Sequence, residues 1–464
     1  MNDRSALRPD IAARLADFAA GFTWQAAPDE ARAVLQLSLL DFAAVALAGA
    51  DEPVARICRE MVLAEGGRPE ATVIGAQVGS ACRPAAGVGA RVPARAAALT
   101  NGVTAHALDY DDTHFRHIGH LAVVIFPATL AVAERTGAEG RAFLEAALVG
   151  YEAAAAIGAW LGRSHYEAGF HQTATAGALA AALAAARLMG LDAAAMVHAL
   201  GLAATRAAGL KAAFGSMAKP YNAGQAAAAG VEAALLAARG LAASPALFAD
   251  FAATHAGAAE VAPVAALGRD YSLPALSHKF HACCHGTHAA IEALGECLLP
   301  PVAPDMVERV EIAVHPRWLS VCALKAPRSG LEARFSLAMV TAMRIAGLDT
   351  GALASFSDTA CRDPLLTDLR ERVRVEGDAS LADTAARVRV RLVSGETRRA
   401  AHDLAVPVPL GDRAARIRAK AEGLLGPARA GALDQAIGAL VGSEQADSLA
   451  VLARLLGTVA GPGG

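Results

Sequence analysis

The sequence predicts a mainly α-helical protein, with a large all-helical domain formed by both chain ends and an inserted, smaller α+β domain. In the first half, apolar residues recur every three or four positions between Gly and Pro residues, which indicates helices. After about residue 270 short segments alternate apolar and polar residues, which is typical of half-buried strands. From Asp412 the helical spacing returns. We therefore place the helical domain at residues 1–270 plus 408–464 and the α+β domain at residues 271–407.

The helices of the first half are expected to pack closely, because alanine and glycine dominate their faces and leave little side-chain bulk between them. Such helices suit a buried bundle. The expected helical segments are 8–21, 28–49, 92–109, 122–136, 140–160, 173–189, 192–206 and 222–240.

The inserted domain is expected to contain strands and helices together. Alternation predicts strands at 310–314, 373–375 and 388–392, and Ser394-Gly395 can turn the chain into a further strand within 397–405. Helical spacing is found at 286–298 and 331–346.

Composition and charge exclude several classes of protein. The 464 residues are 55% hydrophobic and 19% charged, with a formal net charge of −3. Such a charge creates no field that gathers nucleic acid or coats an acidic membrane, so we expect neither partner. The run 171–187 is too short and too rich in alanine and glycine for a membrane span. The first residues have no apolar stretch, which predicts a cytoplasmic protein without a secretory signal.

The cysteines do not form a recognisable metal or disulfide framework. The chain has seven cysteines and no Cys-x-x-Cys pair. The segment 281–288 reads His-Ala-Cys-Cys-His-Gly-Thr-His and offers zinc-type donors, but vicinal cysteines chelate one ion poorly and no second ligand pair follows. We therefore predict no metal and no cofactor. The cysteines are Cys58, Cys82, Cys283, Cys284, Cys297, Cys322 and Cys361.

The densest polar segment runs from His106 to His120 and holds three carboxylates, four imidazoles and a guanidinium. These groups can accept, donate and stabilise protons. A calcium loop is excluded by its spacing, because His114 stands where glycine is required. The plain alternative is that Asp112 or Thr113 only caps the helix that follows. A catalytic or substrate-binding role for part of this segment is the other interpretation.

Two further segments stand just before predicted helices. His171 precedes an alanine-rich helix, where the helix dipole favours an anion and keeps an imidazole neutral and basic; a simple helix cap is the alternative. Ser216 and Lys219 form a Ser-x-x-Lys pattern, but the partner motifs of that class of serine hydrolase are absent. Lys219 is therefore interpreted as a cation for a bound carboxylate or as a surface residue.

A fourth segment, residues 279–288, lies where the helical half gives way to the α+β section. Domain junctions are favoured places for small-molecule sites, which makes Lys279 and His285 candidates. The alternative is a buried helix start in which His288 is satisfied internally.

Together these segments resemble the MmgE/PrpD family. The resemblance is carried by four motifs in the family's order, with a Phe-Ser-Leu helix at 335–337, and spans about residues 10–450. It implies a metal-free enzyme acting on small polycarboxylates, a helical domain with an inserted α+β lid, and a homodimer. The four motifs are Asp109-Tyr-Asp-Asp-Thr113, Gly169-Phe-His171, Lys219-Pro220 with Ala223-Gly224, and Cys284-His285-Gly-Thr-His288.

The resemblance also implies site residues. Where the family commonly has Pro-Ser after the histidine of the first segment, this chain has Leu121-Ala122, and a common Leu-His-Ala-Gly-Arg is replaced by Tyr221-Asn222-Ala-Gly-Gln225. One imidazole and one guanidinium are thus missing, which His114, Arg116 and His117 could replace. The implied catalytic residues are Asp109, Thr113, His120, His171, Lys219 and His285, and the implied substrate-binding residues are Lys219, Lys279, His114, Arg116, His117 and Tyr221.

The chemistry expected from the resemblance is removal of a proton beside a carboxylate of a small di- or tricarboxylic acid. His171 or His120 would be the base, Lys219 would hold carboxylates, Asp109 would orient or charge a histidine, and Thr113 would hydrogen-bond the substrate. We expect a dehydration like that of 2-methylcitrate dehydratase. Epimerisation of an iminodisuccinate-type acid and decarboxylation of a cis-aconitate-type acid remain alternatives, as does a non-catalytic carboxylate-binding relative.

Overall fold

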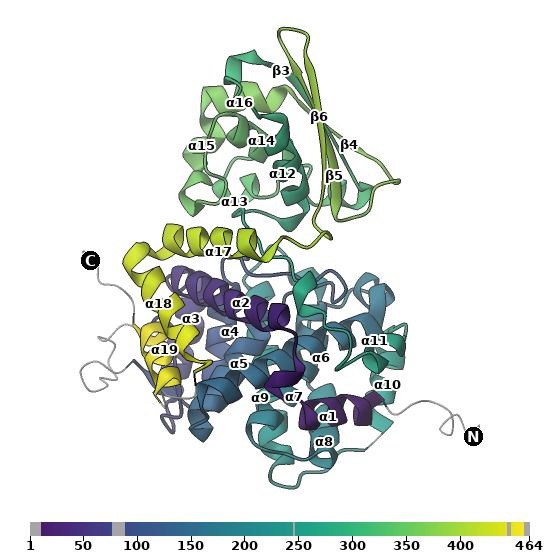
Figure 1. The fold of residues 1–464 in the computed structure, drawn as a ribbon, viewed down its shortest axis with the longest axis vertical. Coiled ribbons are helices and arrows are strands. Elements are labelled where there is room, and N and C mark those ends of the chain that lie inside the picture. Colours follow the sequence, from purple (N-terminus) through teal and green to yellow (C-terminus); the bar gives the residue numbers. More distant parts are fainter. Residues whose placement is uncertain (1–10, 77–88, 245, 443–446, 459–464) are drawn as a thin grey trace. The chain divides into compact units, whose positions relative to one another are not determined.

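The computed structural model describes residues 11–76, 89–244, 246–442 and 447–458. Residues 8–10 of the first predicted helix, the other N-terminal residues and Cys82 lie outside the described part of the chain. The chain divides into two units, one formed by Met1–His278 with Pro409–Gly464 and the other by Lys279–Val408 (Figure 1).

The predicted mainly helical fold with a small sheet region is confirmed. The first unit is helical apart from one short antiparallel pair, β1 (Ala71–Thr72) and β2 (Arg91–Val92). Its N-terminal helices are α1 (Ile11–Gly21), α2 (Asp29–Ala48), α3 (Pro53–Glu65), α4 (Ala94–His106), α5 (Ala122–Thr136), α6 (Gly140–Glu167), α7 (Gln172–Leu188), α8 (Ala193–Ala204), α9 (Ala218–Ala237), α10 (Ala246–Thr254) and α11 (Ala262–Ala265). The chain end adds α17 (Leu410–Leu425), α18 (Pro427–Ala439) and α19 (Ser448–Gly457).

The centre of the first unit is built from α4, α5, α7 and α9, which contact one another in pairs. Small residues allow this close packing. A Cβ added to Gly102 in α4 would lie 2.8 Å from the Cα of Gly224 in α9, and one added to Gly224 would lie 2.3 Å from the carbonyl oxygen of Leu99. Because no side chain separates the two helices, the end of α4 and the start of α9 are held close together. Both ends carry site residues.

The end of the chain packs against its beginning within this unit. Helices α17 and α18 both contact α2, as the yellow and purple ribbons of Figure 1 show. The Lys420 ammonium of α17 lies 2.6 Å from Asp41 Oδ1 of α2 and donates to the carbonyl oxygen of Tyr110 at 2.6 Å. Helix α17 therefore also fixes the backbone of the loop that follows α4.

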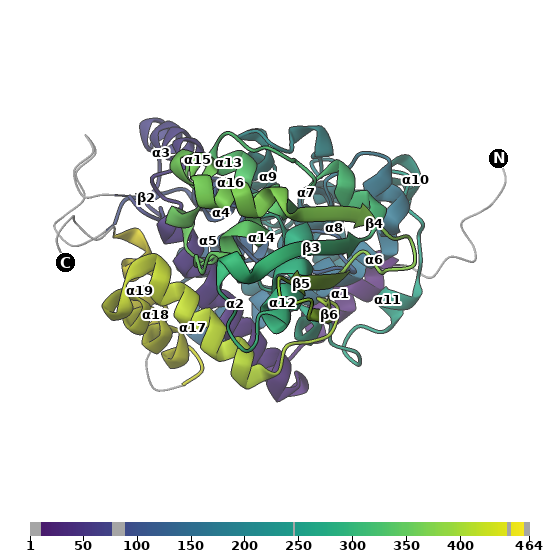
Figure 2. The same ribbon diagram turned by 90° about the horizontal axis from the view of Figure 1, so that it is seen from above.

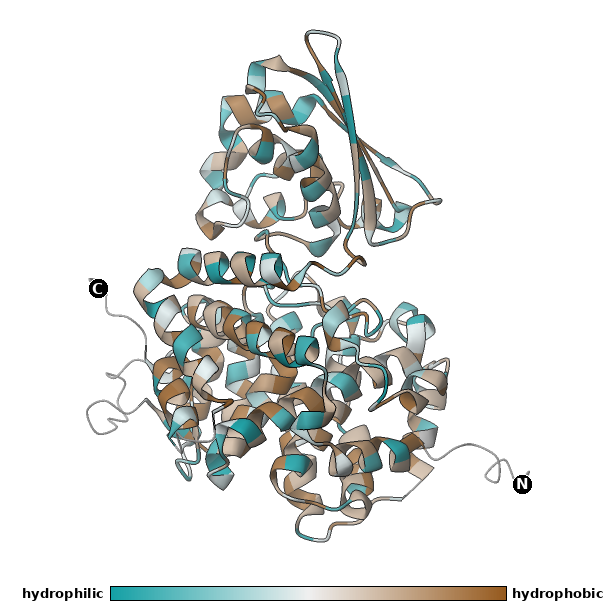
Figure 3. Cartoon of the chain, in the orientation of Figure 1, coloured by the Kyte–Doolittle hydropathy of each residue, from teal (hydrophilic) through white to brown (hydrophobic). Residues whose placement is uncertain are grey.

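Two helices of this unit, Asp29–Ala48 and Gly140–Glu167, are long and apolar enough to cross a membrane on those two criteria alone. Of their most apolar stretches, 78% and 83% are buried inside the protein. The same features are found in core helices, so they are weak evidence for a membrane span. The colouring of Figure 3 shows hydrophobic residues throughout the helices of this unit.

The second unit is a four-stranded sheet in the order β4-β3-β5-β6 (Figure 2). β3 (Val307–Val314) is parallel to β4 (Val373–Gly377) and antiparallel to β5 (Ala385–Leu392), which is antiparallel to β6 (Thr397–Asp403). The predicted alternation is found in β5, whose valines are buried while its arginines are exposed. Helices cover one face of the sheet: α12 (His288–Cys297) contacts β5 and β6, while α14 (Leu337–Ile345) and α16 (Pro364–Glu371) contact β4.

The helix predicted at 331–346 is interrupted. The structure has α13 (Gly330–Ala333) and then α14, with Ser336 between them. Ser336 is extended, and its hydroxyl accepts a hydrogen bond from the Met339 N–H at 3.2 Å, so it caps α14. The Leu337 N–H also bonds the carbonyl oxygen of Cys322 at 2.8 Å. This backbone hydrogen bond to a residue distant in sequence accompanies the break between α13 and α14. Local spacing of apolar residues could not indicate it. The remaining helix of this unit is α15 (Asp358–Arg362).

Candidate active site

The loop between α4 and α5 carries most of the polar segment found in the sequence. The helix predicted to reach residue 109 ends at His106, and Asp109 has a left-handed φ of 51°. A non-glycine residue held in this conformation is strained and usually has a reason. The loop is fastened by backbone bridges of Thr113 with Ser277 and of His114 with Gly119. Asp109 is therefore turned away from the helical path on a rigid loop.

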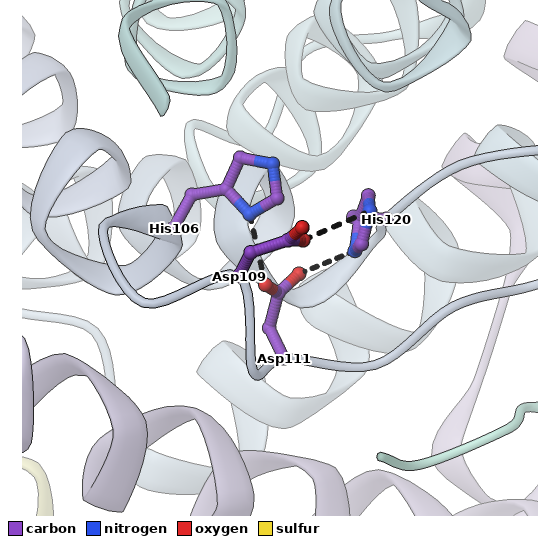
Figure 4. Close-up of side chains that lie close together, drawn as sticks. All are labelled: His106, Asp109, Asp111 and His120. Atoms are coloured by element: carbon purple, nitrogen blue, oxygen red, sulfur yellow. Dashed lines mark hydrogen bonds and ion pairs between the residues drawn. The ribbon is translucent and has the colours of Figure 1, made fainter. Parts of the chain in front are cut away.

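Asp111 is a buried carboxylate between two imidazoles (Figure 4). Its Oδ1 lies 2.8 Å from Nδ1 of His106, and its Oδ2 lies 2.8 Å from Nδ1 of His120. Burial alone would raise the pKa of Asp111, but the two imidazoles outweigh burial and hold the pKa well below its usual range. Asp111 is thus an ionised acceptor that orients both rings. Neither His106 nor Asp111 was among the predicted site residues.

The contacts of His120 define which of its nitrogens carries the proton. Nδ1 lies 2.8 Å from the carbonyl oxygen of Asp112 as well as from Asp111 Oδ2. Both neighbours only accept hydrogen bonds, so the proton of the neutral ring is on Nδ1 and Nε2 keeps a lone pair. Burial lowers the pKa of His120 to about 4, although Asp111 opposes the shift. At neutral pH the ring is therefore a neutral proton acceptor at Nε2.

Asp109 joins this imidazole to the lysine of α9. Its Oδ1 lies 2.7 Å from Lys219 Nζ and 3.6 Å from His120 Nε2. The predicted start of this helix at residue 222 is wrong by four residues, because Lys219 lies in the first turn with Pro220 beside it. Proline is tolerated there, where its missing N–H has no helical partner. The side chains of Asp109 and Lys219 are 33% and 15% exposed, so both can be reached by a small molecule.

His171 is the N-cap residue of α7, as predicted, but its side chain makes no capping bond. Its ring stacks at 6.4 Å from that of His106 and meets the edge of Phe214 at 5.0 Å. The amide nitrogen of Asn222 lies 3.3 Å from His171 Nδ1. Burial, with Lys219 adding to it, holds the pKa of His171 well below its usual range. His171 is therefore a neutral ring beside the same cluster.

The capping role considered for this loop is also found, at Asp112. Its Oδ1 accepts hydrogen bonds from the N–H groups of Leu121 and Ala122 at 3.2 and 3.1 Å, at the start of α5. Tyr151 donates to Oδ2 at 3.0 Å. Burial, together with the adjacent Asp111, raises the pKa of Asp112 to about 7. Asp112 thus caps the helix, while its neighbour Asp111 belongs to the acid–base cluster. The two interpretations of this loop therefore do not exclude each other.

In the middle of the loop, the two histidines do not replace the missing positive charge. His114 Nε2 lies 3.2 Å from the carbonyl oxygen of Ser272, and His117 Nδ1 lies 2.9 Å from that of Ala154. Burial lowers the pKa of His114 to about 4 and that of His117 to about 3, so both rings are neutral at pH 7. Their substrate-binding role stays a prediction, in which neutral rings would contribute hydrogen bonds rather than charge. Arg116 is exposed and adds to the lowering of the His114 pKa.

Thr113 and Tyr221 complete the predicted residues of this unit. The Thr113 backbone pairs with Ser277, while its hydroxyl is buried and has no hydrogen-bond partner among the described residues. His106 Nε2 is likewise buried without a partner in that part of the chain. Orphaned polar atoms of this kind are rare in native proteins and fit a site that binds a polar ligand. Tyr221 is 40% exposed, and its hydroxyl oxygen accepts a hydrogen bond from Gln225.

Lys279 and His285 belong to the second unit. Lys279 is buried, and the His285 ring lies 4.8 Å from that of His288 at an angle of 60°. The internal satisfaction considered for His288 is found, since its Nε2 lies 3.3 Å from the carbonyl oxygen of Cys283. The first unit therefore brings together Asp109, His120, His171 and Lys219, whereas Lys279 and His285 remain predicted site residues of the second.

Four groups of the first unit have the spacing of metal ligands. Donor atoms of His106, Asp109, Asp111 and His120 all lie within 4.8 Å of one another. However, the Nδ1 atoms of both histidines face Asp111, and the Lys219 ammonium faces Asp109. The carboxylates therefore already have N–H groups as partners. An ion would have to displace Lys219 from Asp109. The donor set therefore fits an acid–base cluster better than a metal centre.

The fold and the site define a mainly helical protein with a partly buried carboxylate–imidazole–lysine cluster. The chain matches the MmgE/PrpD N-terminal domain over residues 13–263 and the MmgE/PrpD C-terminal domain over residues 281–428. This chain belongs to the MmgE/PrpD family.

Curated relatives give a narrower comparison. A cis-aconitate decarboxylase of Aspergillus terreus is 29% identical over 327 residues, which cover 63% of this chain and 65% of the relative. The human cis-aconitate decarboxylase is 32% identical over 156 residues, 32% of each chain. The matches thus span less than two thirds of these relatives.

Proposed function

We propose that this protein is a metal-independent lyase that moves a proton at a carbon atom beside a carboxylate of a small di- or tricarboxylic acid. One observation carries the proposal: Asp109 Oδ1 lies 3.6 Å from His120 Nε2 and 2.7 Å from Lys219 Nζ. A proton-accepting nitrogen and a fixed cation are therefore close together, which is what such a reaction requires.

Dehydration and epimerisation need both groups, because removing the proton adds about one negative charge to the substrate carboxylate; decarboxylation develops the same charge as CO2 leaves and needs the cation. His120 Nε2 accepts the proton while Asp111 stabilises the imidazolium that forms. Lys219 has three N–H donors and can hold a substrate carboxylate while remaining beside Asp109. The unpartnered Thr113 hydroxyl supplies a further hydrogen bond to the substrate. A cation that is already in place stabilises the charge of the transition state without rearranging. Its stabilising effect is therefore larger in this site than in water.

Among reactions of this type, we place decarboxylation of a cis-aconitate-like acid first, since both relatives compared above are named for that activity. Decarboxylation removes no proton: the electrons of the breaking C–C bond stay on the carbon skeleton as CO2 leaves, and the Lys219 ammonium delivers a proton to the carbon atom that receives them. Dehydration, expected from the sequence, would instead use His120 as the base and would protonate a leaving hydroxyl group. Epimerisation would return the proton to the opposite face.

The test is turnover of a panel of citrate-like, aconitate-like and substituted succinic acids in D2O, followed by proton NMR. Loss of CO2 with a new methylene signal identifies decarboxylation, a new alkene with loss of water identifies dehydration, and deuterium exchange alone identifies epimerisation. Saturable binding with no turnover across the panel would contradict the lyase and favour a carboxylate-binding relative.

We also propose, from the family resemblance alone, that the protein works in the cytoplasm as a homodimer. Light scattering on the purified protein tests the second part: a mass roughly twice the 47.1 kDa of the chain supports it, and a mass equal to the chain contradicts it.

A further inference from the structure

We infer that Asn222 is a positioning residue that fixes the tautomer of His171, so that this ring offers an N–H donor rather than a lone pair. The catalytic meaning of this inference rests on the proposed function, but the tautomer itself exists without any turnover. Asn222 lies in α9, one turn after Lys219, and His171 lies at the start of α7.

The direction of the hydrogen bond follows from the neighbours of the Asn222 amide. Its Nδ2 lies 3.3 Å from His171 Nδ1 and 3.4 Å from the carbonyl oxygen of Leu210. A carbonyl oxygen only accepts, so the amide presents its NH2 group to Leu210, and the same NH2 group can only donate to the imidazole. Nδ1 must then be the acceptor. The proton of the neutral ring is therefore on Nε2.

The surrounding backbone holds this arrangement in place. The His171 N–H donates to the carbonyl oxygen of Gly209 at 3.0 Å, which fixes the ring's own backbone beside the Leu210 segment. Gly209 has φ of 146°, and a Cβ there would lie 2.5 Å from Ala174 Cβ and 3.4 Å from Asn222 Cγ. Only glycine lets the segment pass this close to both helices. The Leu210 carbonyl is thereby held where it orients the Asn222 amide.

The consequence is that two histidines beside the same cluster have opposite tautomers. His120 carries its proton on Nδ1 and can accept at Nε2, whereas His171 accepts at Nδ1 and can donate from Nε2. Both rings flank His106, at 4.5 and 6.4 Å between ring centroids. Neutral histidines placed in opposite tautomers divide acceptor and donor roles without any difference in charge. This assigns proton removal to His120 and hydrogen-bond donation to His171.

The test is a two-bond proton–nitrogen NMR correlation on protein labelled with 15N-histidine, with the His171 signals assigned by their loss in His171→Gln. We expect the Nε2–H pattern for His171 in the wild type. In Asn222→Asp the carboxylate can only accept, so His171 should change to the Nδ1–H pattern. In Asn222→Leu the preference should be lost. Gln225→Leu removes an amide three residues further along α9 and should leave the His171 pattern unchanged.

An Nδ1–H pattern in the wild type, or the same pattern in the wild type and Asn222→Asp, would overturn the inference. Activity gives a second readout: Asn222→Asp should lower kcat by about 10-fold or more with a smaller change in KM, because a donor used in the transition state is lost. An unchanged kcat in a variant whose tautomer has switched would refute the donor role. If no acid is turned over by the wild type, the proposed function fails while the tautomer result still stands.

Discussion

The two histidine-rich regions of this protein are similar in composition and differ in chemistry. In the loop from His106 to His120, two imidazoles share the buried carboxylate of Asp111. In the segment from Lys279 to His288 the rings lie against one another and against neutral groups: His281 lies 2.7 Å from the Thr350 hydroxyl, and His288 faces a backbone carbonyl. Glu292 Oε1 lies 3.2 Å from His281 Nε2, so one ring of this segment also faces a carboxylate. The presence of histidine is thus less informative than the identity of its partner.

The pKa directions express this difference. A buried carboxylate between two rings keeps the pKa of Asp111 low, so a fixed negative charge lies ready for an imidazolium. In the second region burial raises the pKa of the Cys283 thiol to about 12 and holds that of His288 well below its usual range. We expect substitutions at His120 and at His288 to separate activity from stability.

The largest expected effect is at the cation and its neighbouring ring. Lys219→Ala and His171→Ala should each lower kcat/KM by at least about 10²-fold, a typical contribution of a positioned acid–base or charged group. Steady-state kinetics with the best substrate of the panel measures this, and Lys325→Ala, an exposed lysine of the second unit, is the matched control. Wild-type activity in both variants with an intact fold would remove the site assignment.

The next effect compares one substitution in both regions. His120→Gln should lower kcat/KM by about 10²-fold because the proton acceptor is lost. His288→Gln should lower the melting temperature by several degrees, since it disturbs a buried ring, but leave kcat/KM of the folded protein within about threefold. Thermal melts and kinetics on the same preparations give both values. Equal losses of activity in the two variants would end the distinction between the regions.

A smaller effect is expected at the carboxylates that contact histidine. Asp111→Asn should lower kcat about 10- to 30-fold, because the amide cannot stabilise an imidazolium as a carboxylate does. Glu292→Gln makes the same change beside His281 and should alter kcat by less than about threefold. A greater loss in Glu292→Gln than in Asp111→Asn would reverse the comparison.

The pH dependence should reflect the His120 ring. Where turnover begins with proton removal by His120, whose pKa is lowered to about 4, kcat/KM should fall as the pH decreases through about 4 and stay level from there towards neutrality. Circular dichroism at each pH separates protonation from unfolding. An acidic limb centred near 7 in the folded protein would show that another group is the base.

The smallest expected effect is that of metal removal. Dialysis against a chelator should leave activity within about twofold. The carboxylates that have metal-ligand spacing already face histidine nitrogens and the Lys219 ammonium. Loss of activity that zinc, magnesium or manganese restores would instead identify the loop as a metal centre.

Much of the fold could be predicted because it depends on local spacing. The helix 122–136 was found at its predicted limits, and the strand predicted at 388–392 was found at 385–392, since the helical and strand periods there are uninterrupted. The errors lie where contacts between residues distant in sequence determine where a helix ends. The break before Leu337 depends on Cys322, and the early end of α4 at His106 accompanies the strained turn at Asp109.

The candidate site was predicted in part. The polar density of residues 106–120 identified the region, and the motif resemblance selected Asp109, His120 and Lys219. His106 and Asp111 were missed because five residues of separation give no sign that a helix end and a loop will face each other. The same density wrongly suggested charge at His114 and His117, whose burial is a property of the packed protein.

The sequence by itself determined the helical class, the small sheet region and the family, because these follow from periodic burial and from motifs in order along the chain. Only the tertiary structure decided which nitrogen of His120 carries a proton, which aspartate caps a helix and which orients a base. Those properties depend on the nearest donor or acceptor in space. That neighbour is Asp112 for His120 and, for His171, Asn222 on a different helix.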